Sequence, residues 1–599
     1  MLSNNPFLKL TALTLSVVIL PQCTKLGDSH LQVNQQLASP YTMPATAYLA
    51  MAHNQTGQEQ QALEIMAAGR SIYDGQWQQG LRILSQQKKL TPDLTNDKNM
   101  LLAKVDLIRE RPTAAIRKLS SVHDLDNMGL YNQVQYHEML ASAYRASNNA
   151  TDAVSERIKL EKLLPDNASR SNNRRALWLT VTTLPPAEIS TLALEAPDQS
   201  ELKGWMQLGL ISRKQHNKPQ TMIAEIEQWK TQFPSHPGNY ILPAPLTRAE
   251  PHLFSQPQQI AVLLPLTGKL SGPGEAVRDG FMTAFKEDQT RTNTKIKFYD
   301  TGTNNAQSLY QQAIHDGANY VVGPLGKSSV AAVASENHPV PTLLLNDTNV
   351  GTKQNLYQFG ISPSNEARQV ASKARKNGNT HALIISPADT WGDEVVNAFT
   401  NQWHANGGQV IDTMRYSSSE DVSNAVRDVL HVSESEARTH ELKSILGKKL
   451  QATPRRRQDF DMIFLLAYPS KARQIMPMLR YYYAGDVPVY AISSVYAGNT
   501  NTLKDRDLDG ITFCDMPWVF DHQVGHKSWP EQWNSYNRLF ALGMDSYELS
   551  SQLNQLLLFP AMGVSDHSGV LYLKTNQQIG RILAWGKFKE GQAELISDA

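Results

Sequence analysis

The stretch Gln258–Phe285, QQIAVLLPLTGKLSGPGEAVRDGFMTAF, decides the fold of the second half of this chain. It opens with an apolar run at Ile260–Leu264, which is typical of a buried strand, and passes into a glycine-rich loop. Apolar and small residues then recur at helical spacing, at positions 276, 277, 280, 281, 284 and 285. A strand, a glycine loop and a helix in this order predict the first unit of an α/β domain.

The glycine loop does not fit a nucleotide cradle. The dinucleotide fingerprint needs a third glycine where Val277 follows Gly272 and Gly274. The phosphate loop of nucleoside triphosphatases needs four residues between its glycines, whereas only two separate Gly323 from Gly326. We therefore expect no nucleotide cofactor.

Apolar runs and helical patterns alternate from residue 259 to the end of the chain. The runs are continuous and bounded by turn residues, which favours strands covered on both faces of a parallel sheet. They lie at Ile260–Leu264, Ile296–Tyr299, Tyr320–Val322, Pro341–Leu345, Ala382–Ile385, Met462–Leu466 and Val487–Ile492. About 340 residues exceed one small sheet. We predict an α/β domain of two lobes over 259–599, with Phe359–Pro363 crossing between them.

Residues 46–233 contain helical patterns and almost no strand-like alternation. Small residues recur in pairs 12 apart, at Ala68 and Gly80, at Ala103 and Ala115, and at Ala141 and Ala153. This spacing is similar to the tetratricopeptide repeat, whose period is ~34 residues and whose small residues let paired helices approach closely. We predict a TPR-like helical repeat domain, with a generic helical bundle as the alternative.

Residues 234–258 separate these two regions. They contain prolines at positions 234, 237, 243, 245, 251 and 257. Because proline fixes φ and removes an N–H donor, we predict a semi-extended linker without regular structure.

The N-terminus has the pattern of an export signal over residues 1–22. Lys9 precedes the apolar stretch Leu10–Leu20, which is shorter than the roughly 20 residues that span a bilayer. Cys23 follows at once, and Leu20-Pro21-Gln22-Cys23 resembles a bacterial lipobox, although that motif prefers small residues before the cysteine. We predict acylation of Cys23 and a lipidated tether over 23–45; the alternative is an ordinary cleaved signal. Cys514 is then the one remaining cysteine, and we expect it to be a packed core residue.

No pattern in the sequence argues for catalysis. His137-Glu138 and His440-Glu441 lack the second histidine of a zincin site, and no G-x-S-x-G elbow is present. Ser85 and Lys88 match S-x-x-K, but Ser-Asp-Asn and Lys-Thr-Gly are absent. We expect a protein that is not an enzyme and holds no metal and no cofactor.

Charge composition argues against nucleic acid as a partner. The chain has 57 Lys+Arg and 56 Asp+Glu, a formal net charge of +1. Its one basic cluster has no interleaved aromatic residue to stack on bases, and consists of Lys448, Lys449, Arg455, Arg456 and Arg457. We expect either a solvated loop or a contact with an acidic partner surface or cell-wall carboxylates.

Two segments of the α/β region resemble type I periplasmic binding proteins: Ile260–Gly268 with Gly280, and Val321–Pro324 with the serines that follow. The resemblance implies two lobes joined by crossovers, with small ligands in the cleft at strand ends. The expected polar contacts are Thr267, Gly268, Ser328 and Ser329. The alternative is that the threonine and the serines cap a turn and a helix.

A set of motifs along the α/β region allows a closer comparison: Tyr299–Thr301, Asp316–Leu325, Ile361–Arg368, Trp391–Phe399 and Leu542–Asp545. Together they resemble the LpoA family of outer-membrane lipoproteins, which activate a bifunctional class A penicillin-binding protein. The resemblance covers most of the chain from Ile260 onward.

This resemblance implies a protein without a catalytic group of its own. It would be anchored by lipid in the outer membrane, face the periplasm, and reach through the peptidoglycan mesh, itself a further expected contact, to the synthase. The alternative is a periplasmic receptor that binds a small solute, an amino acid or a sugar, in the interlobe cleft.

Overall fold

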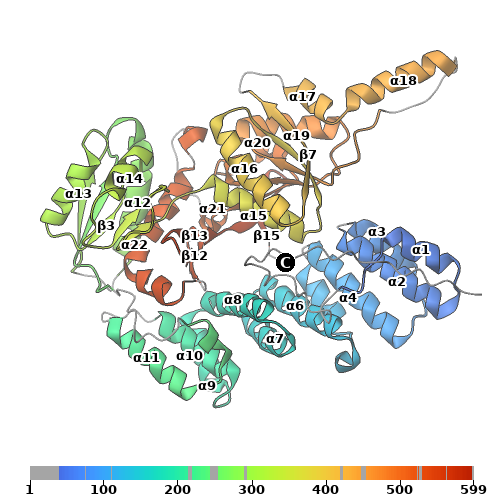
Figure 1. Cartoon of the computed structure of the whole chain (residues 1–599), viewed down its shortest axis with the longest axis horizontal. Coiled ribbons are helices and arrows are strands. Elements are labelled where there is room, and N and C mark those ends of the chain that lie inside the picture. Colours follow the sequence, from blue (N-terminus) through green and yellow to red (C-terminus); the bar gives the residue numbers. More distant parts are fainter. Residues whose placement is uncertain are drawn as a thin grey trace, which may run out of the picture.

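The structure is a computed structural model. It describes residues 39–74, 76–109, 111–213, 219–242, 254–288, 293–417, 422–446, 454–522, 524, 529–533, 535–560 and 563–596. A curved row of helices lies along one side of a two-lobed α/β region (Figure 1), as the predicted fold class requires. The expected signal, Cys23 and most of the expected tether lie outside the described residues. Within those residues no helix is both long and apolar enough to cross a membrane.

The first part of the described chain is all helical. Its helices are α1 (Ala45–His53), α2 (Gly57–Tyr73), α3 (Trp77–Gln86), α4 (Pro92–Ile108), α5 (Pro112–Leu119), α6 (Leu130–Ala146), α7 (Ala150–Leu163), α8 (Asn167–Thr183), α9 (Pro186–Glu195), α10 (Glu201–Arg213) and α11 (Pro219–Gln232). The small residues identified from the sequence are buried and lie on facing helices of the pairs α2–α3, α4–α5 and α6–α7. A Cβ at Gly80 would lie 2.9 Å from the carbonyl oxygen of Ala68, so that pair packs backbone against backbone.

The helical domain continues into the segment predicted as a linker. Pro237–Tyr240 forms a short 3-10 helix, and the buried ring of His236 packs against Trp205 and Trp229. Nε2 of His236 donates to the carbonyl oxygen of Glu201 (2.8 Å), and Nδ1 accepts from the backbone N–H of Gly238 (2.9 Å). Burial lowers the pKa of His236, which favours the neutral tautomer that both bonds require. The prediction of a segment without regular structure is therefore wrong at its start, because these aromatic contacts outweigh the prolines.

The α/β region contains two main sheets and one small sheet. Its strands are β1 (Gln259–Leu264), β2 (Lys295–Asp300), β3 (Tyr320–Val322), β4 (Thr342–Leu344), β5 (Leu356–Gln358), β6 (His381–Pro387), β7 (Gln409–Tyr416), β8 (Met462–Leu465), β9 (Val489–Ala491), β10 (Ile511–Asp515), β11 (Val564–Asp566), β12 (Gly569–Leu573), β13 (Ile579–Ile582), β14 (Ala584–Lys589) and β15 (Gln592–Ile596). The first sheet has the order β2-β1-β3-β4-β5 and is parallel throughout. The second has the order β15-β14-β10-β9-β8-β6-β7, in which β14 and β15 are antiparallel additions.

Helices cover both faces of the first sheet. The helices of the α/β region are α12 (Ser271–Glu287), α13 (Ala306–His315), α14 (Lys327–Ala334), α15 (Pro363–Lys376), α16 (Thr390–Ala405), α17 (Val422–Val429), α18 (Val432–Leu446), α19 (Pro469–Tyr481), α20 (Thr502–Asp505), α21 (Pro517–Asp521) and α22 (Tyr536–Leu558). Val262 and Leu264 pack in one core with α12 and α22, whereas Ala261 and Leu263 pack in another with α13 and α14. This double burial explains the continuous apolar run of the deciding stretch.

The chain crosses between the lobes more than once. It leaves the first sheet after β5 and enters α15 of the second lobe through Phe359–Pro363, as predicted. It returns through α22, which packs against α12, and then reaches the second sheet again at β14. Cys514 is fully buried in the second-lobe core, as expected, and burial raises the pKa of its thiol.

Two glycines allow α12 and α22 to touch. A Cβ at Gly280 would overlap the carbonyl oxygen of Phe540, and a Cβ at Gly543 would overlap that of Val277. Beside this crossing the ring of Phe281 meets Tyr547 edge to face, with centroids 5.4 Å apart. The backbones of two helices far apart in the sequence are therefore in direct contact.

Gly280→Ala and Gly543→Ala should each destabilise the protein, because the added methyl group forces the two helices apart. We expect each to lower the free energy of unfolding by about 1–3 kcal/mol, measured by chemical denaturation. Gly351→Ala is the matched control, since nothing lies within 4 Å of its added Cβ. Equal stability of all three variants would contradict the crossing.

Candidate functional site

A cavity of about 330 Å³ lies between the two lobes, where the resemblance places a small ligand. Three of the residues that line it follow the carboxyl ends of strands: Trp391 after β6, Tyr468 after β8 and Ser493 after β9. Glu366 of α15 and Arg538 of α22 form its floor. Such strand ends are the usual ligand position in parallel α/β sheets.

The polar groups on the floor of this cleft are paired within the protein. Arg538 forms a buried ion pair with Asp515 (2.6 Å) and donates to the carbonyl oxygens of Ser493 and Tyr496. Glu366 accepts from the hydroxyl of Ser493 (2.7 Å), and burial raises the pKa of this carboxyl. These groups bind one another and hold the lobes in register, rather than facing the cavity unpaired.

The mouth of the cleft is bridged by the segment that leads into α22. Glu531 accepts from the hydroxyl of Ser470 in the second lobe (2.8 Å), while Trp533 lies against Gly272 of the first lobe. On the other side of the mouth Trp391 stacks on Tyr468, with centroids 4.8 Å apart and rings 13° from parallel. The cleft is therefore narrowed by the protein's own side chains.

The four residues predicted as cleft contacts do not line this cavity. The hydroxyl of Thr267 donates to Asp300 (2.7 Å), whose other carboxylate oxygen accepts the backbone N–H of Thr267. Although burial opposes it, these hydrogen bonds lower the pKa of Asp300. Gly268 has a φ of +76°, and Ser328 and Ser329 lie in the first turn of α14. Thr267 makes no side-chain cap of the turn that follows it, and Gly326 rather than a serine is the N-cap of α14, so the capping alternative is wrong. Ligand contact by these residues stays a prediction.

The basic cluster is divided by the structure. Arg456 is buried, donates to the carbonyl oxygen of Tyr483 (2.9 Å) and pairs with Asp486. Arg457 pairs with Asp459 and Asp412, both at 2.8 Å. Both guanidinium groups are therefore committed to internal contacts.

The structure describes one of the three other cations of that cluster. Arg455 is exposed, whereas Lys448 and Lys449 lie outside the described residues. A partner contact through the cluster stays a prediction for these three cations.

Replacing Arg456 should cost stability where replacing Arg455 should not. Arg456→Gln removes a buried hydrogen bond to a backbone carbonyl and the pairing of Asp486. We expect a loss of about 1–3 kcal/mol in the free energy of unfolding, against a change within about 0.5 kcal/mol for Arg455→Gln. Thermal and urea unfolding measure both; equal effects would show that the guanidinium of Arg456 is not structural.

Asp545, the last residue of the motif Leu542–Asp545, organises the joint between α22 and the small sheet. It accepts from the backbone N–H groups of His567 (3.0 Å) and Ser568 (2.8 Å) and from the His567 ring (3.0 Å). Burial alone would lower the pKa of His567, but hydrogen bonds to Asp545 and Asp566 raise it to about 11. Nδ1 of His567 lies 3.0 Å from Asp545 and 2.9 Å from Asp566, so these side chains join α22 to the small sheet.

Comparison with known proteins identifies relatives over nearly the whole chain. The family described as LppC putative lipoprotein matches residues 40–591. A Photobacterium profundum protein named penicillin-binding protein activator LpoA is 27% identical over 583 residues, 93% of each chain. Its Vibrio cholerae namesake is 26% identical over 591 residues, 96% of this chain and 97% of its own.

Solved structures with a similar fold were also found. LpoA of Haemophilus influenzae covers 94% of this chain and 99% of its own, at 22% identity and a TM-score of 0.49. A putative branched-chain amino acid ABC transporter of Chromobacterium violaceum covers 55% of this chain, at 25% identity and a TM-score of 0.42.

Proposed function

Because this chain belongs to the LppC putative lipoprotein family, we propose that it binds and activates a bifunctional class A penicillin-binding protein and so regulates peptidoglycan synthesis. One observation carries the proposal: relatives named penicillin-binding protein activator match over both the helical and the α/β part, across more than nine-tenths of their length. The protein acts as a regulator and leaves the chemistry to the synthase.

The interlobe cleft supports this proposal over a solute receptor. A solute receptor needs polar groups that can hydrogen-bond to its ligand, but Arg538 and Glu366 are already paired with neighbouring residues. Glu531 also ties the first lobe to the second across the mouth. We therefore assign partner binding to the outer surface of the molecule.

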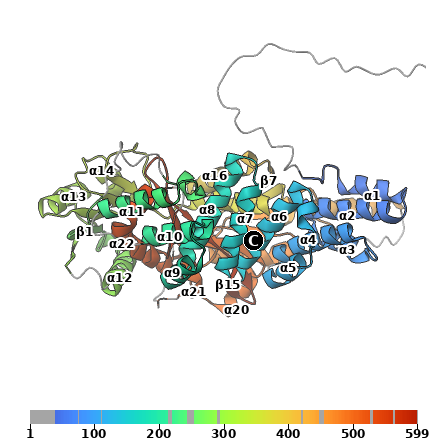
Figure 2. The same ribbon diagram turned by 90° about the horizontal axis from the view of Figure 1, so that it is seen from below.

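The layout of the chain suits a tether at the outer membrane. In Figure 2, α1 lies at one end of the molecule and α13 of the first lobe at the other. An acyl anchor on Cys23 would hold the helical end near the membrane and place the α/β region farther into the periplasm. A row of helix pairs is stiff, so it maintains that distance.

Activation requires the protein to bind an active state of the synthase more tightly than an inactive one. Couplings of this kind are typically about 5–150-fold. Adding the purified full-length protein to a purified class A penicillin-binding protein should therefore raise glycan polymerisation, peptide cross-linking or both by at least about fivefold.

The two reactions are followed separately, by lipid-substrate consumption and by analysis of cross-linked muropeptides. The protein alone should turn over neither substrate. No stimulation, together with a saturable thermal shift by an amino acid or a sugar, would replace the proposal with the solute receptor.

The basic cluster gives a first test of the docking surface. The triple variant Lys448→Gln, Lys449→Gln and Arg455→Gln should weaken synthase binding and reduce its dependence on salt, because three positive charges are removed. Its unfolding temperature should stay unchanged. Unaltered affinity at low and high salt would exclude this cluster as the contact.

A further inference from the structure

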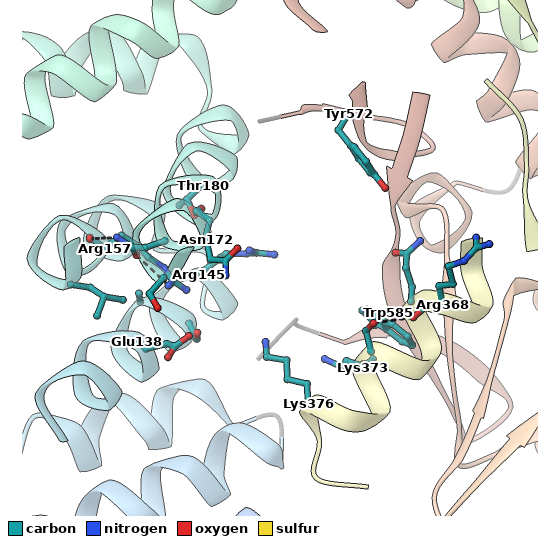
Figure 3. A pocket seen from close by; sticks show the side chains of 18 of the residues that line it. Glu138, Arg145, Arg157, Asn172, Thr180, Arg368, Lys373, Lys376, Tyr572 and Trp585 are labelled. Carbon is teal, nitrogen blue, oxygen red and sulfur yellow. Dashed lines mark hydrogen bonds between the residues drawn. The ribbon is translucent and has the colours of Figure 1, made fainter. Parts of the chain in front are cut away.

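A second and larger cavity, of about 1090 Å³, lies between the helical domain and the α/β region (Figure 3). Helices α6, α7 and α8 form one wall; α15, β12, β13 and β14 form the other. The two regions are joined beside it by a shared core, in which Phe559 after α22 stacks on Trp178 of α8 at 5.2 Å. Ala176 and Thr180 of α8 line the cavity, whereas Trp178 between them belongs to the core, so the cavity and the core lie on different faces of this helix.

The lining of this cavity is strongly cationic. The helical wall contributes Arg145 and Arg157. The opposite wall contributes Arg368, Lys373, Lys376, Lys574 and Arg581. Glu138 is the single acidic residue among the described residues of the lining. In Figure 3, Lys373 and Lys376 extend from α15 toward the helical wall, so like charges face one another across the space.

Several of these cations contact neutral groups. Arg157 donates to the side-chain oxygen of Asn173 (3.5 Å), and Arg368 to that of Asn365 (2.6 Å). The ammonium of Lys373 lies 5.6 Å from the centre of the Trp585 ring. The lining thus combines the seven cationic side chains named above with one acidic side chain, and this excess of positive charge favours an anionic occupant.

Arg581 is an independent sign of a missing acceptor. Its side chain belongs to the cavity lining, yet the residue is only 8% exposed. Its Nη1 is buried and has no hydrogen-bond partner. A buried guanidinium N–H without an acceptor is unfavourable, and a ligand oxygen would satisfy it.

We propose that this interdomain cavity binds an acidic peptide that carries at least two carboxylates. Arginines on both walls and lysines on the α/β wall can donate hydrogen bonds to carboxylates, and a guanidinium group can bind both oxygens of one carboxylate. Amides also line the cavity and provide donors and acceptors for peptide groups, among them Asn172, Gln402 and Gln578. The cavity volume lies just above the roughly 300–1,000 Å³ that small-molecule sites occupy, which suits an oligomer rather than a single amino acid.

The stem peptides of peptidoglycan have this chemistry, and only their choice as the natural ligand rests on the proposed function. A peptide in the cavity would contact α6 and α15 together. Its binding would therefore stabilise one orientation of the helical domain relative to the second lobe.

The probe is a soluble disaccharide-tetrapeptide muropeptide, titrated against the full chain by calorimetry. Its carboxamide derivative and inorganic phosphate serve as comparison ligands. The free acid should bind, and the carboxamide should bind at least tenfold more weakly. Affinity should fall as salt rises. Phosphate that binds as well as the muropeptide would overturn the peptide assignment.

Arg145→Gln and Lys376→Gln remove one exposed cation from each wall, so neither should disturb the fold. Each should weaken muropeptide binding about tenfold, and the double variant more. Arg82→Gln and Lys504→Gln are matched controls, because both residues are exposed and neither lines the cavity. No binding by the unaltered chain, or equal binding by all variants, would overturn the inference.

Stimulation of the synthase is measured on the same samples. Muropeptide binding without stimulation of the synthase would support the proposed cavity site and contradict the proposed function. Stimulation without muropeptide binding would support the proposed function and contradict the cavity site.

Discussion

The contact between α12 and α22 is the constraint on which the rest of the structure depends. Gly280 and Gly543 let the two helix backbones touch, although some 260 residues separate them in the chain. The same helix continues to Leu558 and Phe559, whose side chains enter the core of the helical domain. One helix thus ties the first lobe at its beginning and the helical repeats at its end. Because the contacts at both ends are apolar and closely packed, the orientation of the helical domain follows from the position of α22.

The helical domain and the α/β region are therefore in apolar contact around the end of α22. Beside the stacked rings of Trp178 and Phe559 the walls separate, and polar and cationic side chains replace apolar ones. Apolar surface holds the two domains together at the core, and bringing the cationic walls of the adjacent cavity closer would place like charges near one another. The interdomain cavity is in this sense a consequence of how the joint is built.

Local pattern revealed most of the sheets and the crossing between the lobes at Phe359–Pro363, but not how the domains pack against one another. The run Ile260–Leu264 was recognisable because both faces of β1 are buried, whereas β7 at a sheet edge has half-buried, mixed side chains and was missed. Paired small residues such as Ala68 and Gly80 revealed the helix pairs for the same local reason. The cavity between the domains brings together Arg145 and Trp585, far apart in the chain, and a single sequence carries no signal of that proximity.

The internal ion pairs of Arg456 with Asp486 and of Arg457 with Asp412 could not be predicted for the same reason, because these carboxylates come from distant segments.

The interlobe cleft and the interdomain cavity differ in how their polar side chains are paired. In the cleft, Arg538 and Asp515 satisfy each other, so a ligand would have to displace a buried ion pair. In the cavity, the Nη1 of Arg581 has no hydrogen-bond partner, so a ligand oxygen there would add a hydrogen bond. Ligand binding in the interdomain cavity is thus favoured over ligand binding in the interlobe cleft. Because its walls belong to two domains, occupancy there and partner binding elsewhere are linked through the same orientation, and each must strengthen or weaken the other equally.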